Sequence, residues 1–173
     1  MVLPISLMIF YGLEPQDALA LPKTAISSAG IDTRRQKTGE PLYHPLFEPV
    51  SDALAKAPKH DAITLCANSW GKPWTYNGFS TNWDKLKRVL EAEQKIQPGL
   101  TLKGLRHTVG TILAEMGKDN GTIALVLGHA TEAMAKHYSR RANRSRQASA
   151  AIVDLEAEVN RRKTKVVKPA EQI

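Results

Sequence analysis

The stretch from Gly104 to Tyr138 restricts the fold more than any other part of this sequence. It reads GLRHTVGTILAEMGKDNGTIALVLGHATEAMAKHY, in which three segments with apolar residues at helical spacing are separated by glycines. Such a run predicts three helices that pack against one another across short turns. A helix-turn-helix DNA reader has a similar outline, but its second helix must be exposed and polar. The middle segment, TIALVLGH, is apolar instead, which favours a core element.

The rest of the chain predicts a mostly helical α+β domain with a small antiparallel sheet. Residues 2–13 are apolar nearly all round, as in a buried helix that stops at Gly12. Alternating segments on both sides of the polar turn 37–40 predict a β-hairpin. The remaining expected elements are short helices over 15–22, 48–57 and 131–139, a strand over 62–68, a helix from Asn77, and an amphipathic helix over 141–161. We expect one domain over 1–160 and a basic, flexible tail over 161–173.

The charge of the chain favours an acidic partner. The formal net charge is +7 and the pI about 9.6, and such a surplus promotes binding to polyanions such as DNA through counterion release. Lysine and arginine are dense from Lys136 to Lys168. Charge runs of this kind also form ordinary solvated faces, so composition leaves open a basic protein that binds no nucleic acid.

A single cysteine excludes a disulfide framework and a cysteine-based metal site. Cys66 lies in the apolar run AITLCAN and is expected to be a small buried residue. The apolar N-terminal stretch has no Lys or Arg before it and is too short to cross a bilayer. We therefore expect a cytoplasmic, nucleoid-associated protein with no membrane partner. The spacings of its histidines fit no metal-ligand pattern, so neither a metal nor a cofactor is expected.

Arg106, His129 and Tyr138 would form a phosphoryl-transfer site if the fold brought them together. The planar guanidinium of arginine donates two hydrogen bonds at once to a phosphate, and histidine can donate another. A tyrosine hydroxyl can become covalently joined to phosphorus. Each residue taken singly also fits a structural role, namely a surface arginine, a helix-capping histidine and a buried ring.

Together these residues resemble the tyrosine recombinase family, the phage integrases and related site-specific recombinases. That family has the pattern His-x-x-Arg-His, then Leu-Gly-His, then the nucleophilic tyrosine. Here KGLRH stands at 103–107, LGH at 127–129, and Tyr138 nine residues after His129. Family members also carry a lysine in a β-hairpin turn, often before Thr-Gly, which matches Lys37 in RQKTGEP. The segments GKPWT and GFSTNW look like integrases of bacterial mobile elements, and the resemblance covers roughly residues 3–150.

The resemblance implies the catalytic domain of a DNA strand transferase that needs no cofactor. Tyr138 would attack a phosphate of double-stranded DNA and form a 3′-phosphotyrosine intermediate that can be rejoined. Arg106 and His129 would stabilise the transition state, and Lys37 would protonate the leaving oxygen. Lys103 stands where the family usually has histidine, and it keeps a hydrogen-bond donor there. Further residues expected at the site are Asp17 and His107 in support, and Arg34, Arg35, Arg140 and Arg141 as DNA-binding residues; His107 is expected to be packed behind the Arg106 helix.

One departure from the family pattern puts the activity in doubt. In GLEPQDAL, Glu14 stands three residues before the acidic Asp17, where the family has its first catalytic arginine. A carboxylate would repel the phosphate, and loss of one preorganised donor costs about 10²- to 10³-fold in rate. Arg34 and Arg35 beside the hairpin lysine could reach in, as the weaker alternative. The sequence leaves open a recombinase of low activity, which Glu14→Arg would raise, and an inactive DNA-binding remnant of an integrase.

Two expectations concern parts beyond the catalytic residues. The family's N-terminal core-binding domain has no counterpart in 173 residues, so the resemblance implies a catalytic domain separated or truncated from it, as in a decaying mobile element. The C-terminal helix of the family often docks on a neighbouring protomer of a tetramer on DNA. The apolar stripe Ala148, Ile152, Leu155 and Val159 could pack in this way or on its own chain.

Overall fold

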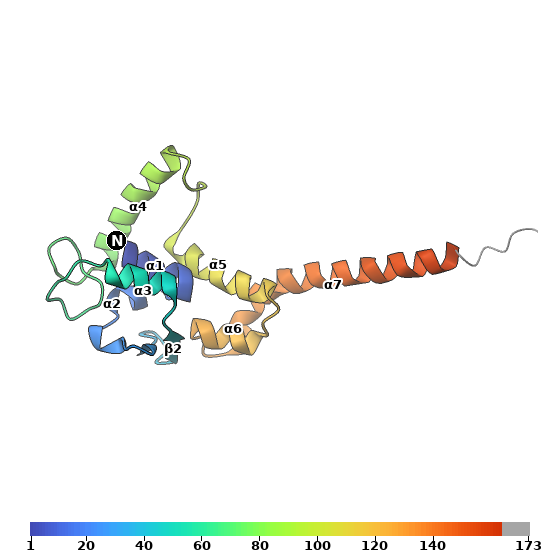
Figure 1. The fold of residues 1–173 in the computed structure, drawn as a ribbon, viewed down its shortest axis with the longest axis horizontal. Helices are drawn as coiled ribbons and strands as arrows, with labels where there is room; N and C mark the ends of the chain where they lie inside the picture. The colour runs from blue at the N-terminus through green and yellow to red at the C-terminus, as the bar shows by residue number, and fades with distance from the viewer. Residues whose placement is uncertain (164–173) are drawn as a thin grey trace, which may run out of the picture.

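The computed structural model describes residues 1–163, except for the side chains of 141–147 and 163. It is mostly helical, with one antiparallel pair of strands (Figure 1), as the sequence predicts. In chain order the elements are α1 (Val2–Tyr11), α2 (Pro15–Ala20), the 3-10 turn η1 (Lys23–Ala25), β1 (Gly30–Arg34), β2 (Pro41–Pro45), α3 (Glu48–Ala55), α4 (Tyr76–Ala92), α5 (Leu102–Glu115), α6 (Asn120–Leu127) and α7 (Glu132–Lys163).

Helix α1 is the centre of the larger core. Leu7 and Met8 are fully buried, and α1 packs on α3 and α5. The helix ends where expected, at Gly12, whose backbone is left-handed with φ 65°. A Cβ atom at Gly12 would lie 2.6 Å from Leu127 Cδ2, so only glycine permits this close approach to α6. The end of α1 is thereby held beside α5 and α6.

The predicted hairpin is present and carries Lys37 at its exposed turn. Strands β1 and β2 pair antiparallel from Gly30 opposite Pro45 to Arg34 opposite Pro41. Along β2 the side chains alternate between exposed and buried, and Leu42 and His44 point inward. The main chain of Arg35 closes the turn, because its N–H donates to Glu40 O at 2.8 Å and its carbonyl accepts from Gly39 N at 2.8 Å.

Helices α5, α6 and α7 enclose a second, smaller core. Val109, Ile123, Leu127, Ala135 and Tyr138 are among its buried residues. Threonine and aspartate N-caps begin two of the helices, because the side chains of Thr101 and Asp119 accept from Gly104 N and Thr122 N. The apolar middle segment of the opening stretch is therefore a core helix, as its composition predicts.

The prediction of a strand over 62–68 is wrong. This segment forms only isolated bridges, between Thr64 and Pro22 and between Ala67 and Pro73. Both partner residues are prolines, which have no N–H to extend a ladder. Cys66 is buried as expected, but Ile63 of the same run is 77% exposed and no regular strand forms.

The two helices expected over 131–139 and 141–161 are one helix, α7. No glycine or proline interrupts the sequence between Glu132 and Lys163, so nothing breaks the hydrogen-bond pattern after Tyr138. The helix includes the first residues of the tail expected over 161–173, and residues 164–173 lie outside the described part of the chain.

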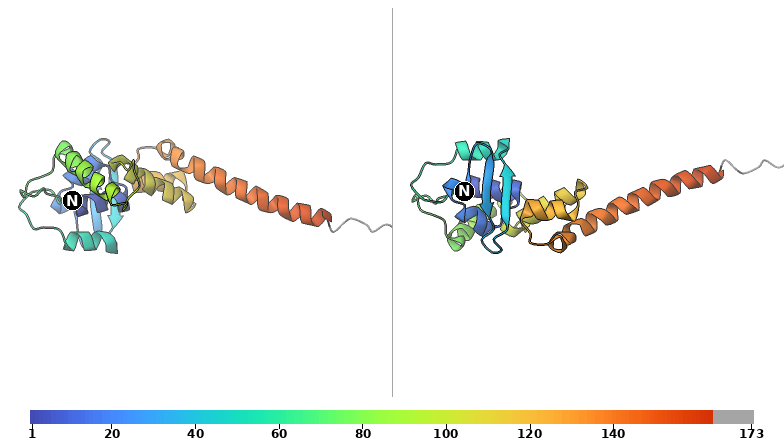
Figure 2. Two further views of the ribbon diagram at one scale, coloured as in Figure 1. Left: turned by 90° about the horizontal axis from the view of Figure 1, so that it is seen from above. Right: turned by 90° about the horizontal axis from the view of Figure 1, so that it is seen from below.

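The C-terminal half of α7 projects away from the body of the molecule (Figures 1 and 2). Its apolar stripe lies in solvent, since Ile152 is 63% exposed and Leu155 56%. The stripe therefore does not pack on its own chain. Within the described residues, no helix combines the length and the apolar character that crossing a membrane requires.

Candidate active site

Tyr138 belongs to α7, and its ring is buried against α5, with 6% of the residue's surface exposed. Its ring covers Gly110 on α5, where an added Cβ atom would stand 2.7 Å from the ring. The His137 ring lies 3.7 Å away between centroids, His107 4.9 Å and His129 5.9 Å. Burial raises the pKa of the Tyr138 hydroxyl, and the nearby Arg106 guanidinium partly opposes this rise. The hydroxyl therefore stays protonated until a reaction removes its proton.

Arg106 is the buried cation at the centre of the site. It projects from α5 and is 4% exposed. Its Nη1 donates to Gly12 O and its Nη2 to Leu127 O, both at 2.6 Å, and its Nε lies 3.3 Å from Glu14 Oε1. The ends of α1 and α6 supply these carbonyls, so the fold fixes the guanidinium in place.

His129 follows the left-handed Gly128 that ends α6. Its backbone N–H donates to Ala124 O at 2.8 Å, which fixes the start of the loop. Burial, together with the positive charges of Arg106 and Arg35, lowers the pKa of the His129 ring to about 4. The ring is therefore neutral near pH 7 and carries one N–H that can donate to a phosphate oxygen.

One pocket of about 410 Å³ gathers the predicted cationic residues from separate elements. Lys37 comes from the hairpin turn and Lys103 from the first turn of α5, and both are exposed. Arg106 and His129 form the inner part of the pocket. The charged and histidine side chains that line the pocket are Glu14, Asp17, Arg35, Lys37, Lys103, Arg106 and His129.

Two carboxylates from the start of α2 pair with the arginines of this pocket. Asp17 Oδ2 lies 2.6 Å from Arg35 Nε, although the N–H is not aligned for a hydrogen bond, so the contact is an ion pair. Glu14 Oε1 lies 3.8 Å from Arg35 Nη2 as well as 3.3 Å from Arg106 Nε. Arg35 is 8% exposed and donates from Nη1 to Leu127 O at 3.0 Å. The pocket thus contains two buried guanidinium groups.

The family model for phage integrases matches residues 23–144, which is more than half of the chain. The chain belongs to the phage integrase family, the tyrosine recombinases. The match includes Lys37, Lys103, Arg106, His129 and Tyr138 and begins after Glu14 and Asp17.

Solved structures of tyrosine recombinases have the same fold. XerA recombinase superposes with a TM-score of 0.67 at 20% identity, covering 84% of this chain and 56% of that one. A lambda integrase dimer bound to a COC′ core site gives 0.64 at 18% identity, covering 79% and 50%. The Tn1549 transposon integrase in complex with transposon right end DNA gives 0.63 at 20% identity, covering 84% and 58%. The chain therefore spans about half the length of these proteins. A separate comparison with curated proteins finds no match.

The remaining residues expected at the integrase site differ in their surroundings. Arg34 is exposed and donates to Gly39 O at 3.1 Å, whereas Arg35 is buried and not on the outer surface. Arg140 is exposed on α7, and the side chain of Arg141 lies outside the described residues. Asp17, expected to support the arginine network, pairs with Arg35.

The prediction that His107 is packed behind the Arg106 helix is wrong. Its side chain is exposed on α5. Its ring lies 5.0 Å from the His137 ring and 4.9 Å from that of Tyr138. Residue 107 follows the inward-facing Arg106, and adjacent residues of a helix point in different directions.

The structure adds Gly110 to the residues that position Tyr138. The sequence held a signal for it, because Gly110 lies four residues after Arg106 and therefore on the same face of α5. Small size on that face makes room for the tyrosine ring. No local pattern, by contrast, marked Arg35 as buried.

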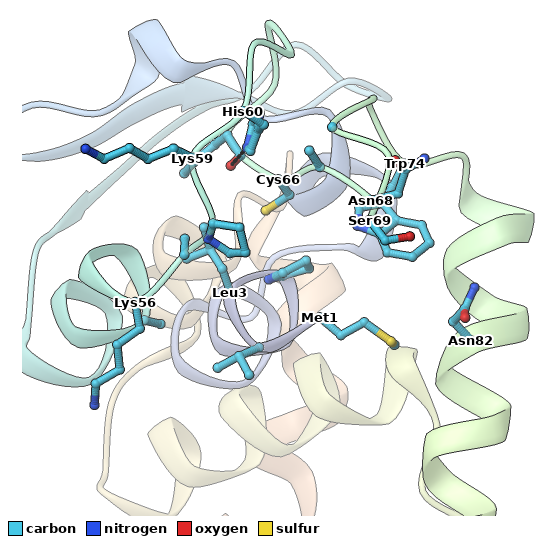
Figure 3. A pocket seen from close by; sticks show the side chains of 18 residues that line it. Met1, Leu3, Lys56, Lys59, His60, Cys66, Asn68, Ser69, Trp74 and Asn82 are labelled. Carbon is cyan, nitrogen blue, oxygen red and sulfur yellow. Dashed lines mark hydrogen bonds between the residues drawn. The ribbon is translucent and has the colours of Figure 1, made fainter.

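A larger pocket, of about 690 Å³, lies elsewhere and shares no lining residue with the 410 Å³ pocket. Figure 3 shows it near the start of α1, with Met1, Leu3, Cys66 and Trp74 around it. Cys66 is buried, as predicted, and burial raises the pKa of its thiol to about 12. The thiol is thus unreactive at neutral pH, and the smaller pocket is the candidate site because the cations converge there.

Proposed function

We propose that residues 1–160 are the catalytic domain of a site-specific recombinase that cleaves and rejoins double-stranded DNA through Tyr138. The observation that carries the proposal is the proximity of Tyr138 to Arg106, which lines a pocket together with His129, Lys37 and Lys103. DNA integration of a mobile element, carried out at the nucleoid, is the reaction we infer from family membership.

The proposed reaction exchanges one ester bond for another. The Tyr138 oxygen bonds to phosphorus as the bond from phosphorus to the 5′ oxygen breaks, and the phenolic proton passes to water. Arg106 and the neutral His129 ring donate to the non-bridging oxygens, whose charge grows in the transition state. The leaving 5′ oxygen takes its proton from Lys37. Because the 3′-phosphotyrosine keeps the energy of the ester, a 5′-hydroxyl can reverse the step.

DNA is the proposed partner. The net charge of +7 supports it, as does family membership, and the lambda and Tn1549 integrases that share this fold are bound to DNA in their structures. We further propose that protomers assemble on DNA, as a tetramer, through the exposed stripe of α7, because burial in a neighbour would remove Ile152, Leu155 and Val159 from water.

A trapping assay tests the enzymatic proposal without knowledge of the target sequence. A pool of nicked duplexes with randomised centres loses its short 5′-hydroxyl strand after cleavage, so that any adduct persists and is visible as a slow band in denaturing gels. We expect an adduct whose linked peptide contains Tyr138, and none with Tyr138→Phe. DNA binding without any adduct would reject the recombinase and leave the second candidate function.

That second candidate is DNA binding without catalysis. The observation that favours it is the position of Glu14, whose carboxylate lies against Arg106, where a phosphate would have to bind. This function predicts salt-dependent DNA affinity and no adduct in either the natural protein or the Glu14→Gln variant. An adduct formed by Glu14→Gln alone would show that the machinery is complete but inhibited.

A further inference from the structure

We propose that Arg35 and Arg106 together form the phosphate-binding site, and that Arg35 supplies the guanidinium that is missing at position 14. This inference rests on the proposed function, because the phosphate in question is the one that Tyr138 would attack. Arg35 immediately follows β1, so the second cation enters from the hairpin and not from the end of α1.

Arg35 and Arg106 are neighbours that share two partners. Both donate to the carbonyl of Leu127, Arg35 from Nη1 at 3.0 Å and Arg106 from Nη2 at 2.6 Å. Both also lie within ion-pair distance of a single atom, Glu14 Oε1. One negatively charged oxygen therefore reaches both guanidinium groups. A non-bridging phosphate oxygen has the same charge character and hydrogen-bonding capacity, so it fits the same position.

The two carboxylates of the pocket have different roles. Asp17 is buried, contacts Arg35 Nε and accepts from the backbone of Gln36 at 3.0 Å, so both of its oxygens are engaged. Asp17 therefore positions Arg35. Glu14 is 31% exposed, and although it is the N-cap of α2, its side chain makes no capping hydrogen bond. Rotation of its side chain frees the anion position without breaking the fold, so Glu14 is a competitor that a DNA phosphate displaces.

The pocket is lined by more positive than negative side chains, which favours binding of an anion. Arg35, Arg106, Lys37 and Lys103 are cationic, while Glu14 and Asp17 are anionic. Arg35 also lowers the pKa of Arg106, as expected of two like charges close together, although burial is the larger cause. A phosphate between them relieves this repulsion.

The side-chain Nε–H signals of Arg35 and Arg106 report on anion binding directly, by NMR of the isotope-labelled protein titrated with inorganic phosphate. We expect both signals to shift together with one dissociation constant. Glu14→Gln, which removes the competing charge at nearly constant shape, should tighten phosphate binding by roughly tenfold. A matched control is Arg88→Gln, because Arg88 is an exposed arginine of α4 that does not line the pocket; the phosphate affinity of this variant should match that of the natural protein.

Removal of Arg35 supplies the decisive comparison. Because Arg35→Gln leaves Asp17 buried without its partner, the double variant Asp17→Asn/Arg35→Gln keeps the pair neutral and the fold intact. We expect it to weaken phosphate binding at Arg106 at least about tenfold and to lower the adduct rate about 10²- to 10³-fold. If the phosphate affinity at Arg106 stays unchanged, the inference is overturned. Arg35 then serves only to hold the end of α6 through its hydrogen bond to Leu127 O.

Failure of this inference and failure of the proposed function have different signatures. Phosphate shifting both arginines, without any DNA adduct, would support the two-arginine site and reject the recombinase. An adduct that forms equally well in the Asp17→Asn/Arg35→Gln variant would support the recombinase and reject a role for Arg35. Arg35→Lys keeps the charge but loses the planar fork, so it should recover part of the phosphate affinity and less of the adduct rate.

Discussion

Glu14 Oε1 lies 3.3 Å from the Nε of Arg106, so a carboxylate holds the arginine that would clamp the scissile phosphate. The same oxygen is 3.8 Å from Arg35 Nη2. The acidic residue that departs from the family pattern is therefore one member of an ion-pair cluster and not an isolated loss. This arrangement changes the expected effect of restoring arginine at position 14.

Glu14→Arg alone should destabilise the protein, contrary to the simple expectation from sequence that it raises activity. The new guanidinium would stand beside Arg35 and Arg106, and two like charges about 4 Å apart repel by about 1 kcal/mol or more. We expect a lower Tm in thermal unfolding and no gain in adduct. Adding Arg35→Gln removes the extra charge, and the new arginine, three residues before Asp17, can replace Arg35 as the partner of that carboxylate. The double variant should therefore recover both the Tm and the adduct yield. A single Glu14→Arg variant that is stable and more active would contradict the two-arginine arrangement.

Gly110→Ala should displace the ring of Tyr138, the proposed nucleophile. The added Cβ would stand 2.7 Å from the Tyr138 ring, and overpacking of this kind costs about 1–3 kcal/mol. Alanine is the better helix former by about 1 kcal/mol, so the net loss of stability should be small while the adduct rate falls at least about tenfold. Denaturant unfolding and the trapping assay measure the two effects. Ile112→Ala, at a half-exposed position of the same helix, is the control; an unchanged adduct rate in Gly110→Ala would show that the ring position is not critical.

The free energy of unfolding should fall as the pH decreases from about 6.5 to about 4. Burial, and to a lesser degree the charge of Arg106, lower the pKa of His44 to about 4 from an ordinary value of 6.5. In this pH range His44 binds a proton in the unfolded chain but not in the folded protein. The free energy of unfolding that is present above pH 6.5 is therefore lost toward pH 4. We expect a loss of roughly 1–3 kcal/mol from His44. Denaturant unfolding at several pH values measures it, and His44→Gln should reduce the slope; an equal slope in that variant would assign the effect to other groups.

Charged substitutions in the α7 stripe should block assembly without affecting the fold. Ile152 and Leu155 are both more than half exposed, so Ile152→Asp/Leu155→Asp should change the free energy of unfolding by no more than about 0.5 kcal/mol. Sedimentation on DNA should then show protomers in place of oligomers. Asp154→Asn, between these positions on the same helix, serves as the control. Oligomers that persist in the double variant would place the interface elsewhere.

Much of the fold followed from local patterns. The helix ending at Gly12, the hairpin around residues 37–40 and the apolar core helix α6 were predicted because periodicity and turn residues act over a few neighbouring positions. The prediction of a strand over 62–68 was wrong because its bridge partners, Pro22 and Pro73, are prolines that have no N–H to extend a ladder. The continuity of α7 through Tyr138 could have been read from the absence of glycine and proline.

The sequence by itself determined the family and the residue types at the site, because the spacing of Arg106, His129 and Tyr138 is recorded along the chain. Tertiary structure decided what surrounds them. Arg35 reaches Leu127 across 92 residues, and no local pattern distinguishes this buried arginine from the exposed Arg34 beside it. Whether a guanidinium lies in solvent or in the pocket depends on how remote elements pack. That packing places Arg35 beside Glu14, an approach that the sequence left open as the weaker alternative.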